Sequence, residues 1–113
     1  MKAAVYRSYG PPEVLQIEDV EQPSLQDGDD DCLLIKVHSA SVNPFDYYFR
    51  KGFLPVRPSN GLFKPQQQIL GIDVAGTVES VGKNITKFKV GDRDFGSCLG
   101  SHAEYVFVQE SKI

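Results

Sequence analysis

The sequence has 113 residues, of which 41% are hydrophobic and 24% are charged, and its formal net charge at pH 7 is -3. This length suits one domain with a core of its own, and the acidic balance lacks the basic face that nucleic-acid binding requires. No run is long and apolar enough to span a membrane, the two cysteines fit a reducing compartment, and the N-terminus lacks a signal peptide, so we expect a cytoplasmic protein.

The first third of the chain predicts three strands. Residues 3–6 are apolar, and residues 14–20 alternate weakly after a Gly-Pro-Pro turn, which favours an antiparallel pair. Residues 22–31 form a polar connector whose aspartates we interpret as a solvated loop rather than a metal site. Residues 32–37 are a nearly continuous apolar run and predict a central strand that is buried on both sides.

A two-turn helix is predicted over residues 44–51. Asn43 is a good N-cap, Pro44 suits the first helical position, and Gly52 can end the helix. The face that follows helical spacing consists of Phe45, Tyr48, Phe49 and Gly52, and Asp46 and Arg50 have the spacing of an i,i+4 ion pair. Spacing alone therefore leaves a purely structural interpretation open, in which Asn43 caps the helix, Tyr48 fills the core and Asp46 pairs with Arg50.

The second half of the chain predicts a long loop and a bent hairpin. Residues 53–68 are interrupted by prolines and predict a loop without regular structure. Residues 70–95 read as strand, turn, short strand, turn and strand, with Gly76 marking a bulge or a close approach of another backbone. Residues 102–108 predict a last strand. Short strands with one short helix indicate a mainly-β fold.

Motifs along nearly the whole chain resemble one known family. They are Met1-Lys2-Ala3 and Tyr9-Gly10-Pro11-Pro12-Glu13-Val14-Leu15; Ser41-Val42-Asn43-Pro44 with Asp46, Arg50 and Gly52; and Gly71, Asp73, Ala75-Gly76, Val78, Val81-Gly82, Phe88, Val90-Gly91-Asp92-Arg93, Phe95-Gly96 and Ala103-Glu104-Tyr105-Val106. In order and spacing the chain resembles the N-terminal GroES-like catalytic domain of the medium-chain dehydrogenase/reductase superfamily, in its zinc-independent quinone oxidoreductase (zeta-crystallin-like) branch. The resemblance implies a partly open β-barrel with one short helix.

The resemblance also implies a function. Such enzymes pass hydride from NADPH to a quinone or an α,β-unsaturated carbonyl, in a cleft between this barrel and a Rossmann domain. No Gly-x-Gly-x-x-Gly follows a strand here, so we expect residues 1–113 to be the substrate-side domain of a two-domain reductase and to be inactive alone. We expect the two-domain parent to be a homodimer. The expected partner is a small molecule, with no nucleic acid and no membrane.

The site residues that the resemblance implies gather around the helix. Asn43 and Tyr48 are the expected catalytic residues, Asn43 also lying at the nicotinamide end of the cofactor, and Asp46, Tyr47 and Leu54 are expected in the substrate cleft. Zinc-dependent relatives carry a ligand cysteine at the position of Asn43 and a His-Glu pair at Ile72-Asp73, so we expect no zinc. Cys98 and His102 could supply two ligands, but a zinc site needs at least three protein groups.

Two other functions remain open. An enoyl-thioester reductase of the same superfamily would carry a tyrosine where this chain has Leu54. A GroES-like module that only binds a partner would leave the predicted helix unexplained.

Overall fold

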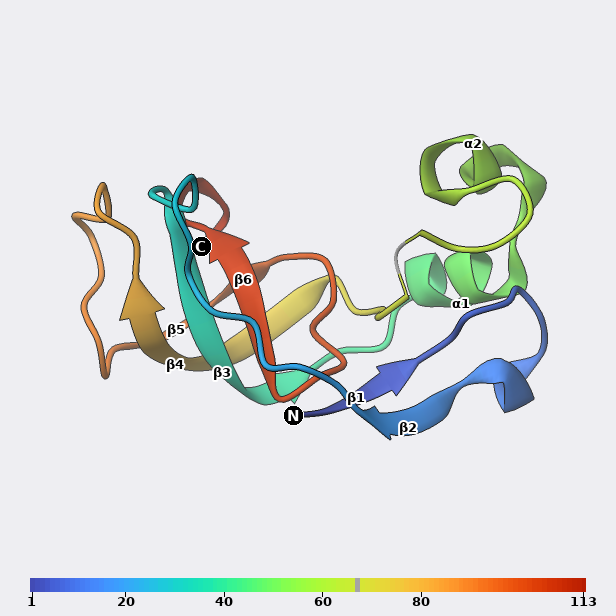
Figure 1. Ribbon diagram of the computed structural model, residues 1–113, viewed down its shortest axis with the longest axis horizontal. Coiled ribbons are helices and arrows are strands. Elements are labelled where there is room, and N and C mark those ends of the chain that lie inside the picture. The colour runs from blue at the N-terminus through green and yellow to red at the C-terminus, as the bar shows by residue number, and fades with distance from the viewer. Residues whose placement is uncertain (67) are drawn as a thin grey trace.

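Two antiparallel sheets and one helix of two turns make up the fold (Figure 1). The computed structural model describes residues 1–66 and 68–113, and their side chains except those of residues 56, 58 and 59. The smaller sheet pairs β1 (Lys2–Val5) with β2 (Gln16–Asp19). The larger has the order β5-β4-β3-β6, built from β3 (Cys32–Ala40), β4 (Asp73–Val81), β5 (Arg93–Ser97) and β6 (Tyr105–Gln109).

The larger sheet carries the core. Its cluster of buried residues consists of Leu33, Ile35, Val74, Val78, Val106 and Val108. Because β3 lies between β4 and β6, the prediction that residues 32–37 form a central strand is confirmed. Single bridges join Ala3 to Ala103 and Val5 to Ile69, so the two sheets curve into a partly open barrel, as predicted.

Gly76 permits the close contact between β3 and β4. A β-carbon added at this position would lie 2.1 Å from the carbonyl oxygen of Lys36. That oxygen belongs to backbone and cannot turn away, so only glycine fits. The predicted close approach of another backbone is confirmed.

Two sequence predictions need correction in this half of the chain. No strand forms within residues 82–92, where a short one was expected between β4 and β5; turns close that connection instead. The last strand begins at Tyr105 rather than at His102, because the preceding residues bend toward β1 and pair with it only at Ala103.

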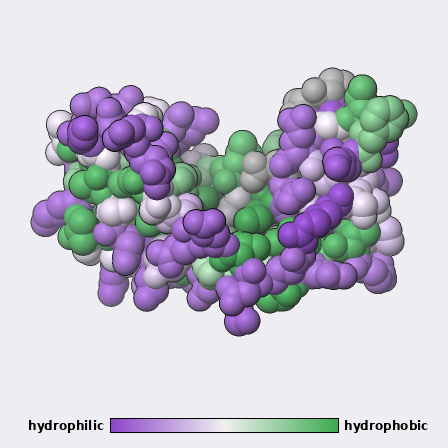
Figure 2. Space-filling model, viewed as in Figure 1, coloured by the Kyte–Doolittle hydropathy of each residue, from purple (hydrophilic) through white to green (hydrophobic). Residues whose placement is uncertain are grey.

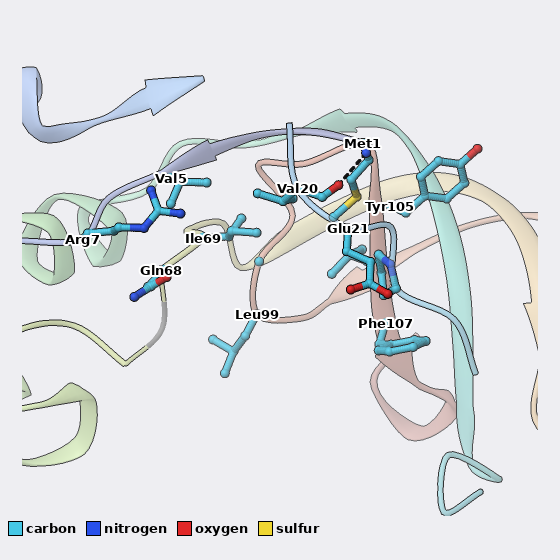
Figure 3. A pocket seen from close by; sticks show the side chains of 13 residues that line it. Met1, Val5, Arg7, Val20, Glu21, Gln68, Ile69, Leu99, Tyr105 and Phe107 are labelled. Atoms are coloured by element: carbon cyan, nitrogen blue, oxygen red, sulfur yellow. Dashed lines mark hydrogen bonds between the residues drawn. The ribbon is translucent and has the colours of Figure 1, made fainter. Parts of the chain in front are cut away.

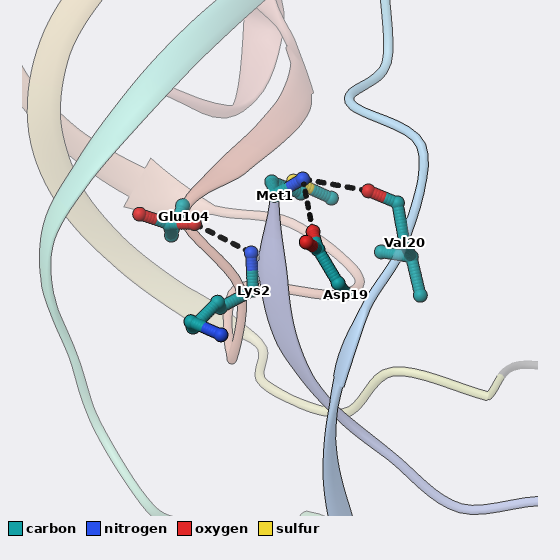
Figure 4. Close-up of polar contacts among 5 residues, drawn as sticks. All are labelled: Met1, Lys2, Asp19, Val20 and Glu104. Carbon is teal, nitrogen blue, oxygen red and sulfur yellow. Dashed lines mark hydrogen bonds and ion pairs between the residues drawn. The ribbon is translucent and has the colours of Figure 1, made fainter.

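The N-terminus is fixed by polar contacts on both sides of β1 (Figure 4). The Met1 ammonium group donates to the Val20 carbonyl oxygen at 2.6 Å and to Asp19 Oδ1 at 3.1 Å. On the other side, the Lys2 N–H donates to the Glu104 carboxylate. These contacts join β1 to β2 and to the segment that enters β6.

Helix α1 (Pro44–Lys51) turns its charged side inward. Asp46 is only 4% exposed and Arg50 only 9%. Asp46 Oδ1 accepts a hydrogen bond from the Gly71 N–H at 3.0 Å and Oδ2 accepts one from the Asn43 N–H at 2.9 Å, while Arg50 donates to the Gly10 carbonyl oxygen at 2.7 Å. Among the ion pairs of the described residues, Asp46 and Arg50 do not pair, so that prediction is wrong. Backbone groups outside the helix are their partners because both side chains face the rest of the domain.

The predicted loop 53–68 contains two short helical turns, Leu54–Val56 and α2 (Arg57–Asn60). Residue 67 of that loop lies outside the described residues. Asn60 is buried and donates to the Tyr6 hydroxyl at 3.0 Å, and the Tyr9 hydroxyl donates to the Gly61 carbonyl oxygen at 2.7 Å. Contacts with tyrosines of the N-terminal segment, distant in sequence, give this proline-rich segment its structure.

Asp94 of β5 has an unfavourable environment. Both carboxylate oxygens are enclosed, and neither has a hydrogen-bond partner among the described residues. Burial, with a smaller contribution from the charge of Asp92, raises the pKa of the Asp94 carboxyl above its ordinary value. The folded state therefore holds this proton more tightly than the unfolded chain does, and stability is lost as pH rises from the ordinary carboxyl pKa through the raised one.

None of the helices that the structure describes has the length and apolar character needed to cross a bilayer.

We predict that Asp46→Ala lowers the free energy of unfolding by about 2 kcal/mol, because two backbone N–H groups lose a charged acceptor. Urea denaturation followed by circular dichroism measures this. Asp27→Ala is the matched control, since Asp27 is exposed in the polar connector. Equal effects of the two substitutions would contradict the anchoring role of Asp46.

We predict that Asp94→Asn raises the free energy of unfolding at pH 7, by less than about 1 kcal/mol because solvent partly screens the site. The gain should shrink as pH falls through the raised pKa and vanish below the ordinary carboxyl pKa, where Asp94 is protonated in both states. Urea denaturation from pH 8 down to about pH 3 tests this, and a gain that is independent of pH would show that ionisation is not the cause.

Candidate functional site

Four polar residues from three segments of the chain meet at the N-terminal end of α1. We call Ser41, Asn43, Asp73 and His102 the polar cluster. Asp73 Oδ2 accepts hydrogen bonds from the Ser41 hydroxyl at 2.8 Å and from Asn43 Nδ2 at 3.1 Å. Asn43 Nδ2 also donates to the Ser41 hydroxyl oxygen at 2.8 Å. The side chains of Ser41, Asn43 and Asp73 therefore each contact the other two.

These contacts fix the orientation of the Asn43 amide. A carboxylate only accepts hydrogen bonds, so the amide atom that faces Asp73 is the nitrogen. Both N–H bonds of that nitrogen are used inside the cluster, and the amide oxygen faces the Asp46 N–H in the capping box that opens α1. Because Oδ1 has two lone pairs, Asn43 can still offer one acceptor to a ligand, whereas the donor role that its amide could have played is already taken.

His102 supports the cluster from the segment before β6. Its Nε2 lies 2.9 Å from the Ser41 carbonyl oxygen. Since a carbonyl oxygen only accepts, Nε2 carries the hydrogen and donates it. The backbone that carries Ser41 and leads to Asn43 is thereby held against the start of β6.

Cys98 lies near the same cluster. Burial raises the pKa of its thiol, the Ser101 hydroxyl opposes this shift, and the Asp73 charge adds to it. The protonated thiol is therefore the form present near neutral pH, whereas metal ligation and nucleophilic attack require the thiolate.

The ligand positions of the zinc-dependent relatives can be compared directly with this geometry. Asn43 and Asp73 are in contact, so two of those positions do meet in space. The third holds the side chain of Ile72, which cannot ligate a metal. Within residues 1–66 and 68–113 the structure contains no group of three or more His, Cys, Asp or Glu side chains placed to hold a metal ion.

A cavity of about 540 Å³ opens beside the polar cluster. It is lined by Ser39, Ala40, Ser41, Asp73, Val74, Ala75, Phe95, Gly96 and Ser97. Phe95 is 78% exposed, so its ring forms an apolar wall of the opening. Sequence reasoning missed this cavity; the signal for it was an aromatic residue on the short strand β5, which pairs with Ala75 of β4.

A second group of exposed residues consists of two tyrosines of α1 and two apolar residues just beyond its end. We call Tyr47, Tyr48, Phe53 and Leu54 the aromatic ridge. Ring centroids are 5.5 Å apart for Tyr47 and Tyr48, and 5.2 Å apart for Tyr48 and Phe53. Tyr48 is 44% exposed, so the alternative that it fills the core is wrong. Asp46, expected in the substrate cleft, is instead buried beneath the helix.

A further hollow lies where the two sheets meet. Figure 2 shows hydrophobic residues gathered in the saddle between the two ends of the molecule. Figure 3 shows a cavity of about 440 Å³ with Val5, Ile69, Leu99 and Phe107 among its lining residues. None of the predicted site residues lines it.

Comparison with known proteins shows the family to which the chain belongs. Residues 29–113 match the family model for the alcohol dehydrogenase GroES-like domain. Quinone oxidoreductase from Sus scrofa is 37% identical over 116 residues, an alignment that covers 100% of this chain and 32% of the pig protein.

Solved structures that are similar to this chain support the same family. Quinone oxidoreductase from Coxiella burnetii is 33% identical with a TM-score of 0.81, over 99% of this chain and 35% of that one. A mycobacterial protein solved as a complex with NADPH is 32% identical with a TM-score of 0.80, over 100% of this chain and 34% of that one. This chain thus spans about a third of the length of these proteins. It belongs to the alcohol dehydrogenase GroES-like domain family, in the quinone oxidoreductase branch of the medium-chain dehydrogenase/reductase superfamily.

Proposed function

We propose that this chain is the substrate-side domain of an NADPH-dependent reductase that transfers hydride to a quinone or an α,β-unsaturated carbonyl. The observation that carries the proposal is the oriented Asn43 amide, which belongs to a polar cluster beside a cavity of about 540 Å³. The family assignment and the NADPH complex of a similar mycobacterial protein support the choice of cofactor.

The residues present fit the nicotinamide end of such a cofactor. Its carboxamide NH2 and its ribose hydroxyls can donate hydrogen bonds, and Asn43 Oδ1 is an acceptor whose orientation the polar cluster has already set. When bound, the cofactor supplies the hydride. We therefore assign Asn43 to binding and orienting the cofactor, the second of the two roles expected of it, rather than to donating a proton or hydrogen bond to the substrate.

Tyr48 is the better candidate for the donor. Hydride addition to a quinone or enone builds negative charge on the carbonyl oxygen, and a fixed donor at that oxygen lowers the barrier. No hydrogen bond within the described part of the chain uses the exposed Tyr48 phenol. Tyr48 follows Asn43 by five positions, a rise of about 7.5 Å along the helix axis, which one small substrate can bridge.

The rest of the aromatic ridge suits the wall of a cleft. Tyr47, whose ring contacts that of Tyr48, is exposed, and so is Leu54; planar apolar substrates pack well on such side chains. Zinc has no part in the proposed chemistry, because the ligand positions of the zinc-dependent relatives hold an amide, an isoleucine and one carboxylate. Charge on the substrate oxygen is met by the phenol instead.

We predict that Asn43→Ala, in the full-length protein that contains this chain, raises the dissociation constant of NADPH about fivefold, the value of one ordinary hydrogen bond. Fluorescence titration measures it. Asn84→Ala is the matched control, because Asn84 is an exposed asparagine whose side chain bonds only Asp31, at 3.2 Å, among the described residues. An unchanged dissociation constant in a folded Asn43→Ala protein would remove Asn43 from the cofactor site.

We predict that Tyr48→Phe lowers turnover on the best quinone or enone substrate about 100-fold, since losing one oxyanion donor typically costs about 2.7–4 kcal/mol. The assay contains EDTA, so that activity of the parent protein also tests independence from zinc. Tyr105→Phe, which removes a phenol on β6, is the control. Normal turnover by Tyr48→Phe would exclude its hydroxyl from the mechanism.

A further inference from the structure

Two basic side chains lie in one row across the larger sheet, on the face that points away from its core. Lys36 of β3 lies opposite Thr77 of β4, and Thr77 lies opposite Arg93 of β5. Residues directly opposite each other on neighbouring strands point to the same face. Lys36 and Arg93 are exposed, and neither side chain forms an ion pair with a described residue. The row is therefore a local positive patch on a chain whose formal net charge is -3.

His38 joins this row through a β-bulge. The register between β3 and β4 shifts between Val37 and Ser39, so His38 has no residue opposite it on β4. Its Nε2 lies 2.9 Å from Thr77 Oγ1. If Nε2 donates this hydrogen bond, the Thr77 O–H stays free to donate, and if Thr77 donates it, Nδ1 of the neutral ring carries the hydrogen and is the free donor. The pair thus keeps one hydrogen-bond donor for a ligand in either case.

A cavity of about 300 Å³ opens beside these donors. It is lined by His38, Ala75, Gly76, Thr77, Arg93 and Asp94. Asp94 is the one acid in this lining, and both of its carboxylate oxygens are enclosed. Arg93 carries five N–H donors and no acceptor, in a planar fork that matches two oxygens of one oxyanion. The cavity therefore suits an anion better than a cation.

We propose that this cavity binds a phosphate group, which Arg93 and the free donor of the His38–Thr77 pair hold by hydrogen bonds. The charge of Lys36 beside Thr77 adds to that of Arg93, and two cations suit a phosphate dianion better than a carboxylate. None of these residues belongs to the polar cluster or to the aromatic ridge. The proposal therefore does not rest on the proposed function.

The position of the cavity allows two sources for the phosphate. Ala75 lines both this cavity and the larger one beside the polar cluster. Asp73 and Thr77 are four residues apart on the same face of β4, or about 13 Å along the strand. The phosphate group is therefore either part of a substrate that extends from the larger cavity or a separate small anion.

Asp94 provides a test of the sign of the ligand's charge. Its carboxylate is not presented to the ligand, but its negative charge lies beside the cavity and opposes the binding of an anion. Asp94→Asn removes that charge and keeps the size of the side chain. The substitution should therefore strengthen phosphate binding, whereas it would weaken the binding of a cation.

The experiment is a calorimetric titration of the full-length protein with inorganic phosphate at low ionic strength, where charge interactions are least screened. NADPH is present, so that sites for the cofactor's own phosphates are filled. We expect Arg93→Gln to weaken phosphate binding about tenfold, the value of a charge-assisted hydrogen bond, and Asp94→Asn to strengthen it about twofold. Lys87→Gln removes an exposed cation that does not line the cavity and is the control.

Turnover then distinguishes the two sources. The Michaelis constants of the parent and of Arg93→Gln are compared on one enone with and without a phosphate ester on its side chain. A rise confined to the phosphorylated enone assigns the site to the substrate, whereas unchanged constants for both, together with weakened phosphate binding, assign it to a separate anion.

Three results would overturn the proposal. Equal phosphate binding by the parent and a folded Arg93→Gln protein would exclude the cavity as the site. Equal weakening by Lys87→Gln would show that phosphate responds only to the total charge. Weaker binding by Asp94→Asn would contradict the expected sign. Because the titration does not depend on turnover, each of these results leaves the proposed function standing.

Discussion

The buried carboxylate of Asp46 is the constraint on which the rest of the site depends. It accepts hydrogen bonds from the N–H of Asn43, at the start of the helix, and from the N–H of Gly71, just before β4. A buried charge is tolerated only where such donors replace water. These two bonds therefore set where α1 begins relative to β4, and with it the distance between Asn43 and Asp73.

This anchoring explains why α1 is inverted relative to an ordinary surface helix. A helix usually buries its apolar stripe and exposes its charges. Here the side chains of Asp46 and Arg50 form hydrogen bonds with backbone groups of the domain, and the aromatic ridge faces outward. Aromatic side chains that stay exposed to water do not contribute their hydrophobic burial to the stability of the fold. An exposed aromatic surface of this kind therefore indicates a binding function.

The polar cluster shows how one framework can serve different chemistry. Two positions that hold zinc ligands in related enzymes remain in contact here, but they carry an amide and a carboxylate that bond each other. The same proximity that would suit ligands of a metal ion instead orients an amide.

The sequence by itself determined the elements whose signals are local. The Asn-Pro start and glycine end of α1, the continuous apolar run of β3 and the glycine in β4 each depend on a few neighbouring residues, and the motifs in order identified the family. Only the tertiary structure decided that Asp46 and Arg50 bond backbone groups rather than each other, that Tyr48 faces outward, and that Asp73 lies against Asn43, 30 residues away in sequence. It also revealed the turns within residues 53–66, which are held by Tyr6 and Tyr9. The physical reason is that helical spacing fixes which side chains share a face, whereas the partner that each face meets depends on how distant segments pack.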